Sequence, residues 1–400
     1  MSLTIVLSDN AHWRKRLFPF ASSRPVGHLR VGILTLQEKW SKVFGCDVGY
    51  STVPYLQAAY PFPEGDSQEY LYIRANVLPT EALLKELQNL KVGDVLLDAN
   101  QWVAFKVSTP VENIDEMIPQ LRPFRSSAEI ANLNFLEDIF LQNRSQLLFD
   151  YNLLTQGRQS QPLSSSNTVY GGWIFVEEGA QVEGASLNSL EGPIYIGKNA
   201  VIEEGTFLRG YVSVCAGSRV KIGAKLYPNT TIGPGSTVAG EINNTVIWGN
   251  SAKGHEGYLG CSVLGEGCNI GAGSSNSNLK NNWSPVRLFD YEGLTFRETD
   301  VLKCGLFMGD YAMAAINSSF NTGTVIGVAA QVAMSKFIPK FVPDFTWNTD
   351  ADSVVYDFDK FESMLDRRAS ASGMRPADHM IGVFWEIFEE SAFLRTANQH

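Results

Sequence analysis

Apolar residues recur with a six-residue period in the second half of the chain. Every step of six from residue 196 to residue 238 reaches an aliphatic side chain, in the series Ile196, Ile202, Leu208, Val214, Val220, Leu226, Ile232 and Val238. A fixed short period of this kind is typical of a parallel β-helix, in which each short strand buries one side chain in a column and then turns a corner. An ordinary meander sheet would instead alternate with period two.

The same period extends on both sides of this series after small phase shifts. It runs through Val176 and Val182, through Val246, Ala252 and Tyr258, through Leu264 and Ile270, and through Phe320, Ile326 and Val332. The pattern therefore predicts a left-handed parallel β-helix of hexapeptide repeats over residues 168–345. Two insertions, residues 188–193 and 278–303, interrupt it, and loops that project from a rigid scaffold often carry function.

The chain before residue 126 alternates strand-like and helix-like segments. Strands are expected at residues 3–7 and 70–74, helices at residues 34–44 and 80–89, and a hairpin at residues 95–99 and 102–106. Alternation of this kind predicts an α/β domain over residues 1–125. Residues 126–167 are expected to form a helical segment, at 127–151, and a polar linker rich in serine and glutamine. Residues 346–400 are expected to form a helical cap, with helices at 358–368 and 379–393.

Composition and charge narrow the function classes. The chain has 400 residues, of which 44% are hydrophobic and 18% charged, as in a globular protein of two or three domains. A formal net charge of -10 and the lack of a basic run argue against nucleic acid or an anionic membrane as the main partner. The 5 cysteines are scattered, which predicts reduced thiols rather than a disulfide framework. Neither a signal peptide nor a membrane span is recognisable, so a cytoplasmic location is expected.

One histidine of the 5 in the chain, His255, lies in the predicted β-helix. Gly254 and Gly257 flank it, and a polar Asn/Ser run follows about one coil later. The pKa of a free imidazole lies near neutral pH, so a histidine can take the proton from an amine that attacks a thioester. Position alone is equally compatible with a structural histidine that is hydrogen-bonded in the fold.

The residues around His255 resemble a known signature. His255, the run Tyr258-Leu259-Gly260, and Asn269-Ile270-Gly271-Ala272-Gly273 followed by Asn278 are similar, with the same spacing, to the acetyltransferase motif of the bifunctional GlmU-like family. Members of that family are glucosamine-1-phosphate acetyltransferases and N-acetylglucosamine-1-phosphate uridyltransferases. The motifs EKW, GPIYIG, SNLKNN and FNTGTV resemble a variant branch of Bacteroidetes-like bacteria, with a shortened, degenerate nucleotidyltransferase domain.

The resemblance implies an acetyl-CoA-dependent acetyltransferase that acts on an amino-sugar phosphate similar to glucosamine 1-phosphate. His255 would be the general base. The substrate-binding residues would be Tyr258, Asn269 and Glu241, with Arg209 and Lys225 as nearby cations, and the coenzyme A side would be formed by Ala272, Asn278, Gly309 and Asp310. No metal ligands are implied in this part of the chain. The resemblance also implies a homotrimer with its sites between subunits.

Several positions depart from the family pattern. Tyr227 and Asn243 stand where the family usually has basic residues for the sugar phosphate, and Leu279 stands where it has a tyrosine. Tyr311 and Met313 replace a histidine and a lysine of closer relatives. Arg209 and Lys225 are cations that could replace the missing charge, although such side chains are mostly solvated surface.

The N-terminal part resembles a nucleotidyltransferase whose chemistry needs a glycine-rich phosphate loop and a magnesium carboxylate. The loop after the first strand is Ser8-Asp9-Asn10-Ala11, without glycine, and Ala75-Asn76 replaces the family's Gly-Asp metal motif. The domain is therefore expected to be degenerate, and magnesium is expected only if it is active. Other residues that could still hold a phosphate are Arg24-Pro25, Arg30, Gly32, Thr35, Glu38 and Lys39.

Two further functions remain open from the sequence. One is a sugar-1-phosphate nucleotidyltransferase, alone or in bifunctional synthesis of UDP-N-acetylglucosamine. The other is a non-catalytic trimeric assembly or binding protein, which the missing basic residues favour. A zinc carbonic anhydrase on the same coil would need three converging histidines, and a single histidine in the β-helix does not supply them.

Overall fold

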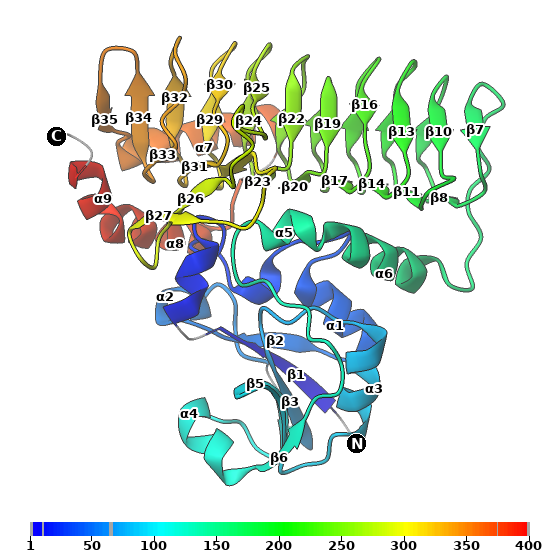
Figure 1. The fold of residues 1–400 in the computed structure, drawn as a ribbon, viewed down its shortest axis with the longest axis vertical. Helices are drawn as coiled ribbons and strands as arrows, with labels where there is room; N and C mark the ends of the chain where they lie inside the picture. Colours follow the sequence, from blue (N-terminus) through cyan, green and yellow to red (C-terminus); the bar gives the residue numbers. More distant parts are fainter. Residues whose placement is uncertain (1–2, 10–11, 64–66, 374, 398–400) are drawn as a thin grey trace.

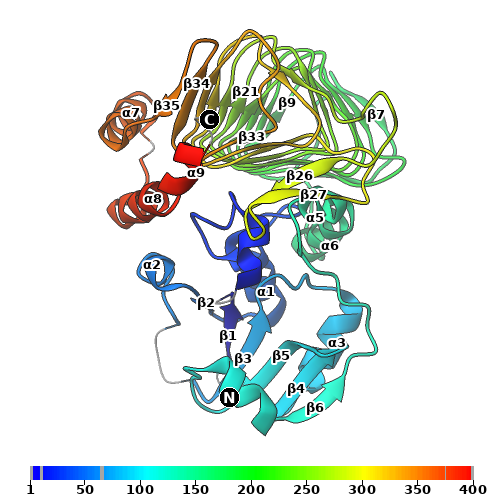
Figure 2. The ribbon, with the colours of Figure 1, turned by 60° about the vertical axis from the view of Figure 1, so that its left-hand side comes forward.

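A computed structural model describes residues 3–9, 12–63, 67–373 and 375–397. A long parallel β-helix lies against a smaller α/β region formed by the first part of the chain (Figure 1). Figure 2 looks almost along the coil and shows its strands arranged around a closed interior, with the α/β region below one face. The expected combination of an α/β region, a β-helix and C-terminal helices is confirmed.

The α/β region contains a mixed sheet of six strands in the order β2-β1-β3-β5-β4-β6. The strands are β1 (Leu3–Ser8), β2 (Val48–Ser51), β3 (Glu69–Arg74), β4 (Asp94–Asp98), β5 (Gln101–Val107) and β6 (Arg122–Arg125). The helices are α1 (Leu36–Phe44), α2 (Pro54–Gln57), α3 (Glu81–Asn89) and α4 (Ile114–Met117). The strands, helices and hairpin expected here are confirmed, whereas β2, β6 and the short helices were not foreseen.

The helix expected over residues 127–151 begins later than its apolar spacing indicates. Only α5 (Asp138–Leu141) and α6 (Asn143–Thr155) are α-helical there. Residues before Asp138 are not helical, because their backbone pairs with the loop after β3: Leu78 N donates to Ala131 O at 2.9 Å and Leu133 N to Asn76 O at 2.9 Å. The apolar spacing in this stretch reflects burial against the sheet rather than a helical face.

The β-helix has three sheets, each of which forms one of its faces, and their strands pair in parallel except for the antiparallel last strand β35. The open face consists of β7 (Thr168–Tyr170), β10 (Ser186–Asn188), β13 (Phe207–Arg209), β16 (Lys225–Leu226), β19 (Glu241–Asn243) and β22 (Tyr258–Gly260). The docked face consists of β8 (Ile174–Val176), β11 (Ile194–Ile196), β14 (Val212–Val214), β17 (Thr230–Ile232), β20 (Val246–Gly249), β23 (Val263–Glu266), β28 (Leu306–Met308), β31 (Thr324–Ile326) and β33 (Phe341–Val342).

The third face is the longest, and it extends past the expected end of the coil at residue 345. It consists of β9 (Gln181–Val182), β12 (Val201–Ile202), β15 (Arg219–Val220), β18 (Thr237–Val238), β21 (Ala252–Lys253), β24 (Asn269–Ile270), β29 (Met313–Ala314), β32 (Gln331–Ala333), β34 (Thr346–Thr349) and β35 (Ser353–Val355). A short pair, β25 (Ser275–Asn276) and β30 (Ser319–Phe320), lies beyond β22.

The expected interior column is confirmed for the series from residue 196 to residue 238, whose side chains share one buried core. The phase was wrong in the following coil, where Val246, Ala252 and Tyr258 were expected to point inward. The inward positions there are one residue later, at Ile247, Lys253 and Leu259. The cause is a shorter turn: strand register pairs Ile232 with Ile247, fifteen residues on, instead of eighteen.

The longer insertion forms a hairpin of β26 (Arg287–Asp290) and β27 (Thr295–Glu298). Its turn and its second strand hold it to the α/β region, because Glu292 pairs with Arg16 and Arg297 pairs with Glu137. Val286, Leu288, Phe289 and Tyr291 of the insertion belong to a core that includes residues of the α/β region. The insertion therefore joins the two regions rather than reaching toward the open face.

One hydrophobic core runs from the α/β region into the docked face. Trp248, Val263 and Phe307 point outward from the coil and pack in the same cluster as Phe20 and Leu36. The ring centroids of Phe20 and Trp248 are 4.7 Å apart, and Trp248 Nε1 donates to Arg30 O at 3.1 Å. Burial of large aromatic side chains contributes strongly to stability, so the two regions form one packed unit.

A buried ion pair ties α6 to α1. Lys39 Nζ lies 2.5 Å from Asp150 Oδ2, and both side chains are 0% exposed. The same carboxylate oxygen accepts from Ile33 N at 2.7 Å and Leu34 N at 2.9 Å. Burial raises the pKa of Asp150 and lowers the pKa of Lys39, and the attraction between them opposes both shifts.

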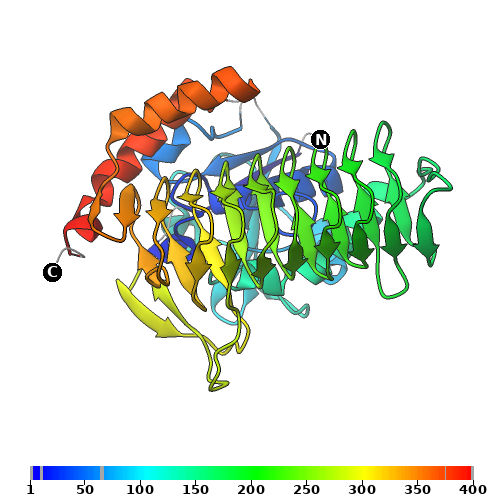
Figure 3. The same ribbon diagram turned by 90° about the horizontal axis from the view of Figure 1, so that it is seen from above.

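The C-terminal helices are α7 (Phe358–Ser372), α8 (Asp378–Glu390) and α9 (Ala392–Ala397). Figure 3 shows α7 and α8 beside the C-terminal end of the coil. The two expected helices are confirmed, although the second is interrupted at Ser391. They cover the corner between the docked and third faces, where Tyr311 packs against Phe361 and Phe384.

Two further findings concern the cysteines and the helices. All of the cysteines are free, as expected, and all but Cys46 are buried. None of the helices in the described part of the chain is both long and apolar enough to cross a membrane.

Candidate functional site

A row of polar side chains crosses the open face. Lys225 is the in-register neighbour of Glu241, and Glu241 is the neighbour of Tyr258. In a parallel sheet such neighbours point to the same side and lie about 4.8 Å apart. Lys225 is exposed and the other two are half-buried, and burial raises the pKa of the Tyr258 hydroxyl. Three of the residues expected at the substrate site are therefore together.

His255 lies on the turn of residues 254–257, which joins the third face to the open face just before β22. Its side chain is exposed, and within the described residues the imidazole has no hydrogen-bond partner. The structural role left open by the sequence would require such a partner, and none is present among the described residues. A free base next to the row on β22 can take a proton from a bound substrate.

The backbone of this turn, in contrast, is firmly held. Lys253 Nζ donates to His255 O at 2.5 Å, and Lys221 Nζ donates to Gly254 O at 3.0 Å. From the next coil, Gly273 N donates to the carbonyl of Glu256 at 3.1 Å. The main chain that carries the imidazole therefore accepts hydrogen bonds at three successive carbonyls, those of Gly254, His255 and Glu256.

Asn278 and Ala272 lie close to His255 and Tyr258. Asn278 Nδ2 donates to the hydroxyl of Tyr258 at 3.0 Å. Ala272 belongs to the equivalent turn of the next coil, which is bonded to the His255 turn through Gly273. The structure thus brings both of these expected coenzyme residues to the same corner.

Asn269 lies on the other side of this corner. It is exposed on the third face, where it is the register neighbour of Ala252 on one side and Met313 on the other. It therefore does not share the open face with Tyr258. Within one chain, a ligand on the Lys225–Glu241–Tyr258 row would have to reach around the turn to touch it.

Arg209 is on the open face but far along it. Three strand spacings separate β13 from β22, which is about 14 Å at about 4.8 Å each. The guanidinium of Arg209 is paired with Glu191 at 3.1 Å, and both side chains are more than half exposed. Arg209 and Lys225 line a shallow hollow of about 290 Å³ together with the aromatic residues Tyr170, Phe207 and Tyr227.

Gly309 and Asp310 are not near this site, which corrects the expectation that they line the coenzyme. They lie at the corner between the docked and third faces, and Asp310 is 1% exposed. Its carboxylate accepts from Ser23 Oγ at 2.6 Å and from Glu266 N at 2.8 Å, and it pairs with Arg24. This corner holds the α/β region on the coil, and the Asp310 carboxylate is used for that contact.

The nucleotidyltransferase elements of the α/β region are also used for packing. Asn76 is 1% exposed and donates to Leu133 O and Asn134 Oδ1, each at 3.2 Å. Asp9 is equally buried and accepts from Val26 N at 2.7 Å. Asn10 and Ala11 lie outside the described residues. No group of three or more acidic, histidine or cysteine side chains that could hold a metal occurs among the residues described.

The cations that could have held a phosphate are occupied. Arg24 pairs with Asp310 and Glu266, Lys39 pairs with Asp150, and Arg30 donates to the carbonyl of Ile33. These contacts neutralise or cover the positive charge. A phosphate would therefore compete with existing partners, although Arg24, Arg30 and Thr35 line a cavity of about 90 Å³.

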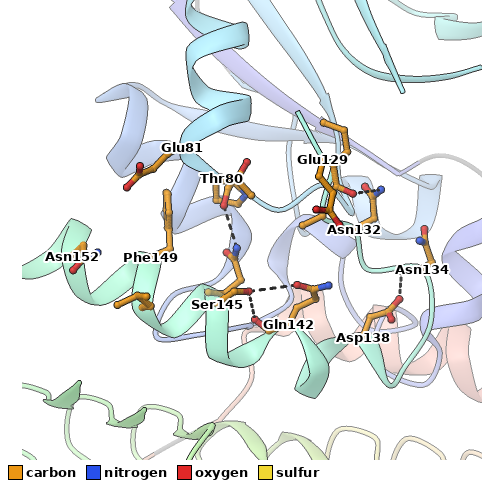
Figure 4. A pocket seen from close by; sticks show the side chains of 15 residues that line it. Thr80, Glu81, Glu129, Asn132, Asn134, Asp138, Gln142, Ser145, Phe149 and Asn152 are labelled. Carbon is orange, nitrogen blue, oxygen red and sulfur yellow. Dashed lines mark hydrogen bonds between the residues drawn. The ribbon is translucent and has the colours of Figure 1, made fainter. Parts of the chain in front are cut away.

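A larger hollow, of about 590 Å³, lies between α3 and α6 and was missed from the sequence. Figure 4 shows Thr80, Glu81, Glu129, Asp138 and Gln142 around it. Its lining includes no lysine or arginine. An acidic hollow repels a nucleoside triphosphate, and no local motif in the sequence indicated it, because its walls come from separate segments.

Residues 5–159 match the family model of sugar nucleotidyl transferases. The bifunctional protein GlmU of Methanocaldococcus jannaschii is 29% identical over 131 residues, which are 33% of this chain and 30% of the relative. GlmU of Wigglesworthia glossinidia brevipalpis is 28% identical over 181 residues, 36% of each chain. The matched stretch spans about a third of the length of these curated relatives.

Among solved structures, a UDP-N-acetylglucosamine acyltransferase from Campylobacter jejuni aligns with 57% of this chain and 96% of its own, at 12% identity and a TM-score of 0.28. A hexapeptide transferase family protein from Anaplasma phagocytophilum aligns with 59% of this chain and 90% of its own, at 15% identity and a TM-score of 0.18. Over these stretches the chain is similar to bifunctional GlmU proteins, and its N-terminal region is similar to the sugar nucleotidyltransferases.

Proposed function

We propose that the protein transfers an acetyl group from acetyl-CoA to the amine of an amino-sugar phosphate of the glucosamine 1-phosphate type, in the cytoplasm. The observation that carries the proposal is the imidazole of His255, which is exposed, has no hydrogen-bond partner in the described part of the chain, and lies on a tightly held turn beside Tyr258 and Asn278. An amine must lose a proton as it attacks a thioester, and a positioned histidine accepts that proton efficiently near neutral pH.

The roles of the neighbouring residues follow from their positions. Tyr258 and Glu241 would hydrogen-bond the sugar next to the base, and Ala272 and Asn278 would line the side that takes the thioester. Lys225 is two strand spacings from β22, about 10 Å, and its flexible side chain could meet the phosphate of a bound monosaccharide. Arg209 is one spacing farther and already paired, so Lys225 is the better candidate.

We predict that a second copy completes the site in a homotrimer whose axis runs along the coils. Large apolar side chains are exposed along this side of the coil: Ile222 at 69%, Ile316 at 66% and Phe207 at 55%. Closed cyclic assemblies bury such patches. Light scattering should give about 132 kDa, three times the 44.1 kDa of one chain.

A matched pair of variants makes this prediction specific. Ile316→Asp is expected to shift the trimer toward monomer, because it places a charge in the contact. Leu190→Asp, at a 70% exposed side chain on the shorter insertion, is expected to leave the mass unchanged. A monomeric parent protein at micromolar concentration would exclude the trimer and the shared site.

The experiment that tests the function has two arms on one preparation. With acetyl-CoA and glucosamine 1-phosphate, the protein is expected to release free coenzyme A in proportion to N-acetylated product. With magnesium, UTP and N-acetylglucosamine 1-phosphate, it is expected to release little pyrophosphate, because Asn76 and the cations of the α/β region are already engaged.

The opposite pattern would favour the second candidate, a nucleotidyltransferase related to the family matched by residues 5–159. If the first arm is silent with every amino-sugar phosphate tried and the second arm is silent too, the non-catalytic assembly function is the one that remains.

A further inference from the structure

Lys253 occupies a position in the interior of the coil. It is the register neighbour of Val238, whose side chain belongs to the buried aliphatic column, and it is only 1% exposed. The equivalent positions of the coils before and after it are apolar: Val182, Ile202, Val220, Val238, Ile270 and Ala314. A buried ammonium costs several kcal/mol in such surroundings, so an apolar residue would pack better.

The ammonium of Lys253 makes a hydrogen bond to the main chain of the His255 turn. Its Nζ donates to the carbonyl oxygen of His255 at 2.5 Å, and among the described residues no carboxylate lies within ion-pairing distance of it. Burial lowers the pKa of Lys253 to about 8, and the nearby charge of Glu256 opposes this shift. A side chain added at Gly257 would put its Cβ 3.3 Å from Nζ.

The turn that it reaches is intrinsically loose. Gly254 and Gly257 flank His255 and Glu256, and Gly257 has a φ of 133°, in the region that favours glycine. Glycines widen the range of backbone conformations open to a turn. Lys221, which is half-buried, also holds this turn, through the carbonyl of Gly254. The tether at His255 itself, however, comes from inside the coil.

We infer that Lys253 is a positioning residue, which fastens the main chain of the 254–257 turn from the interior so that the His255 imidazole stays at a fixed place beside Tyr258. This rests on the proposed acetyl transfer, in which a displacement of the base by about 1 Å costs roughly a hundredfold in rate. On this view, the Lys253 ammonium orients the His255 imidazole, although an apolar side chain would pack better at its position.

Lys253→Met tests this, because methionine has nearly the same length and no charge. The variant is expected to fold at least as stably as the parent, since a buried charge is replaced by an apolar side chain. Its kcat is expected to fall about tenfold to a hundredfold, with the KM for both substrates unchanged. Amide hydrogen exchange in residues 254–257 is expected to be faster. Lys198→Met, which removes an exposed lysine elsewhere on the coil, should change none of these.

Three outcomes would overturn the inference. One is parental kcat with parental exchange in the turn. Another is a loss of activity that merely follows a lower melting temperature, which would show that Lys253 supports the fold only. The third is a parent protein that transfers no acetyl groups together with unchanged exchange in the 254–257 turn of Lys253→Met, which removes both the proposed function and the tether. Faster exchange in that turn of an inactive protein would overturn the proposed function alone.

Discussion

Replacement of His255 by alanine is expected to lower the turnover of acetyl transfer by about a hundredfold to ten-thousandfold, the usual contribution of a positioned general base. The KM values for both substrates are expected to stay close to those of the parent, because the imidazole acts mainly in the transition state. The fold and the trimer should survive, because the side chain is exposed and has no partner among the described residues.

The measurement is steady-state kinetics with acetyl-CoA and glucosamine 1-phosphate at one pH, beside a thermal melt of each variant. His12→Ala is a suitable control, since His12 is also exposed but lies in the α/β region. Acetylation by His255→Ala at the parental rate would remove His255 from the mechanism. A lower rate accompanied by a clearly lower melting temperature would point to misfolding instead.

Replacement of Asp150 by alanine is expected to lower the free energy of unfolding by about 3–5 kcal/mol, the range for breaking one partner out of a buried ion pair. The change leaves the ammonium of Lys39 in a site with no exposure and removes the acceptor of Ile33 N and Leu34 N. Urea denaturation followed by circular dichroism should show the midpoint moving to lower denaturant.

The double variant Lys39→Met with Asp150→Leu separates charge from packing. Replacement of both partners of a buried pair by apolar side chains of similar volume is often neutral or stabilising. The double variant is therefore expected to be clearly more stable than Asp150→Ala alone. Equal instability of the two would show that the hydrogen bonds from Ile33 N and Leu34 N to the Asp150 carboxylate, and not the uncompensated charge, carry the effect.

The fold could be predicted where one local rule holds from coil to coil. The six-residue period identified the column through Val238 because each strand buries one side chain and each turn has the same length. The period predicted the wrong inward residue at Ile247, where one coil is shorter, because a fixed period contains no information about a shortened turn. It also could not identify Lys253 as interior, because a charged residue is normally read as surface.

The candidate site could also be predicted only where its residues are close together in the sequence. His255, Tyr258 and Asn278 lie within one coil of each other, so a local motif could bring them together. The role of Asp310 could not be read locally, because its partner Arg24 is 286 residues away in the sequence. The same holds for the insertion at 278–303, whose contacts with Arg16 and Glu137 decide that it joins two regions.

The core shared between the α/β region and the docked face has a consequence for synthesis on the ribosome. Phe20 is made among the first residues, yet it packs against Phe307, whose ring centroid is 6.5 Å away. Val325 lies in the same cluster. Nascent domains generally fold in order from the N-terminus, but here the earliest segment cannot finish until most of the coil has emerged. Until then, we expect the growing chain to expose aromatic side chains of the α/β region such as Phe20 and to depend on chaperones.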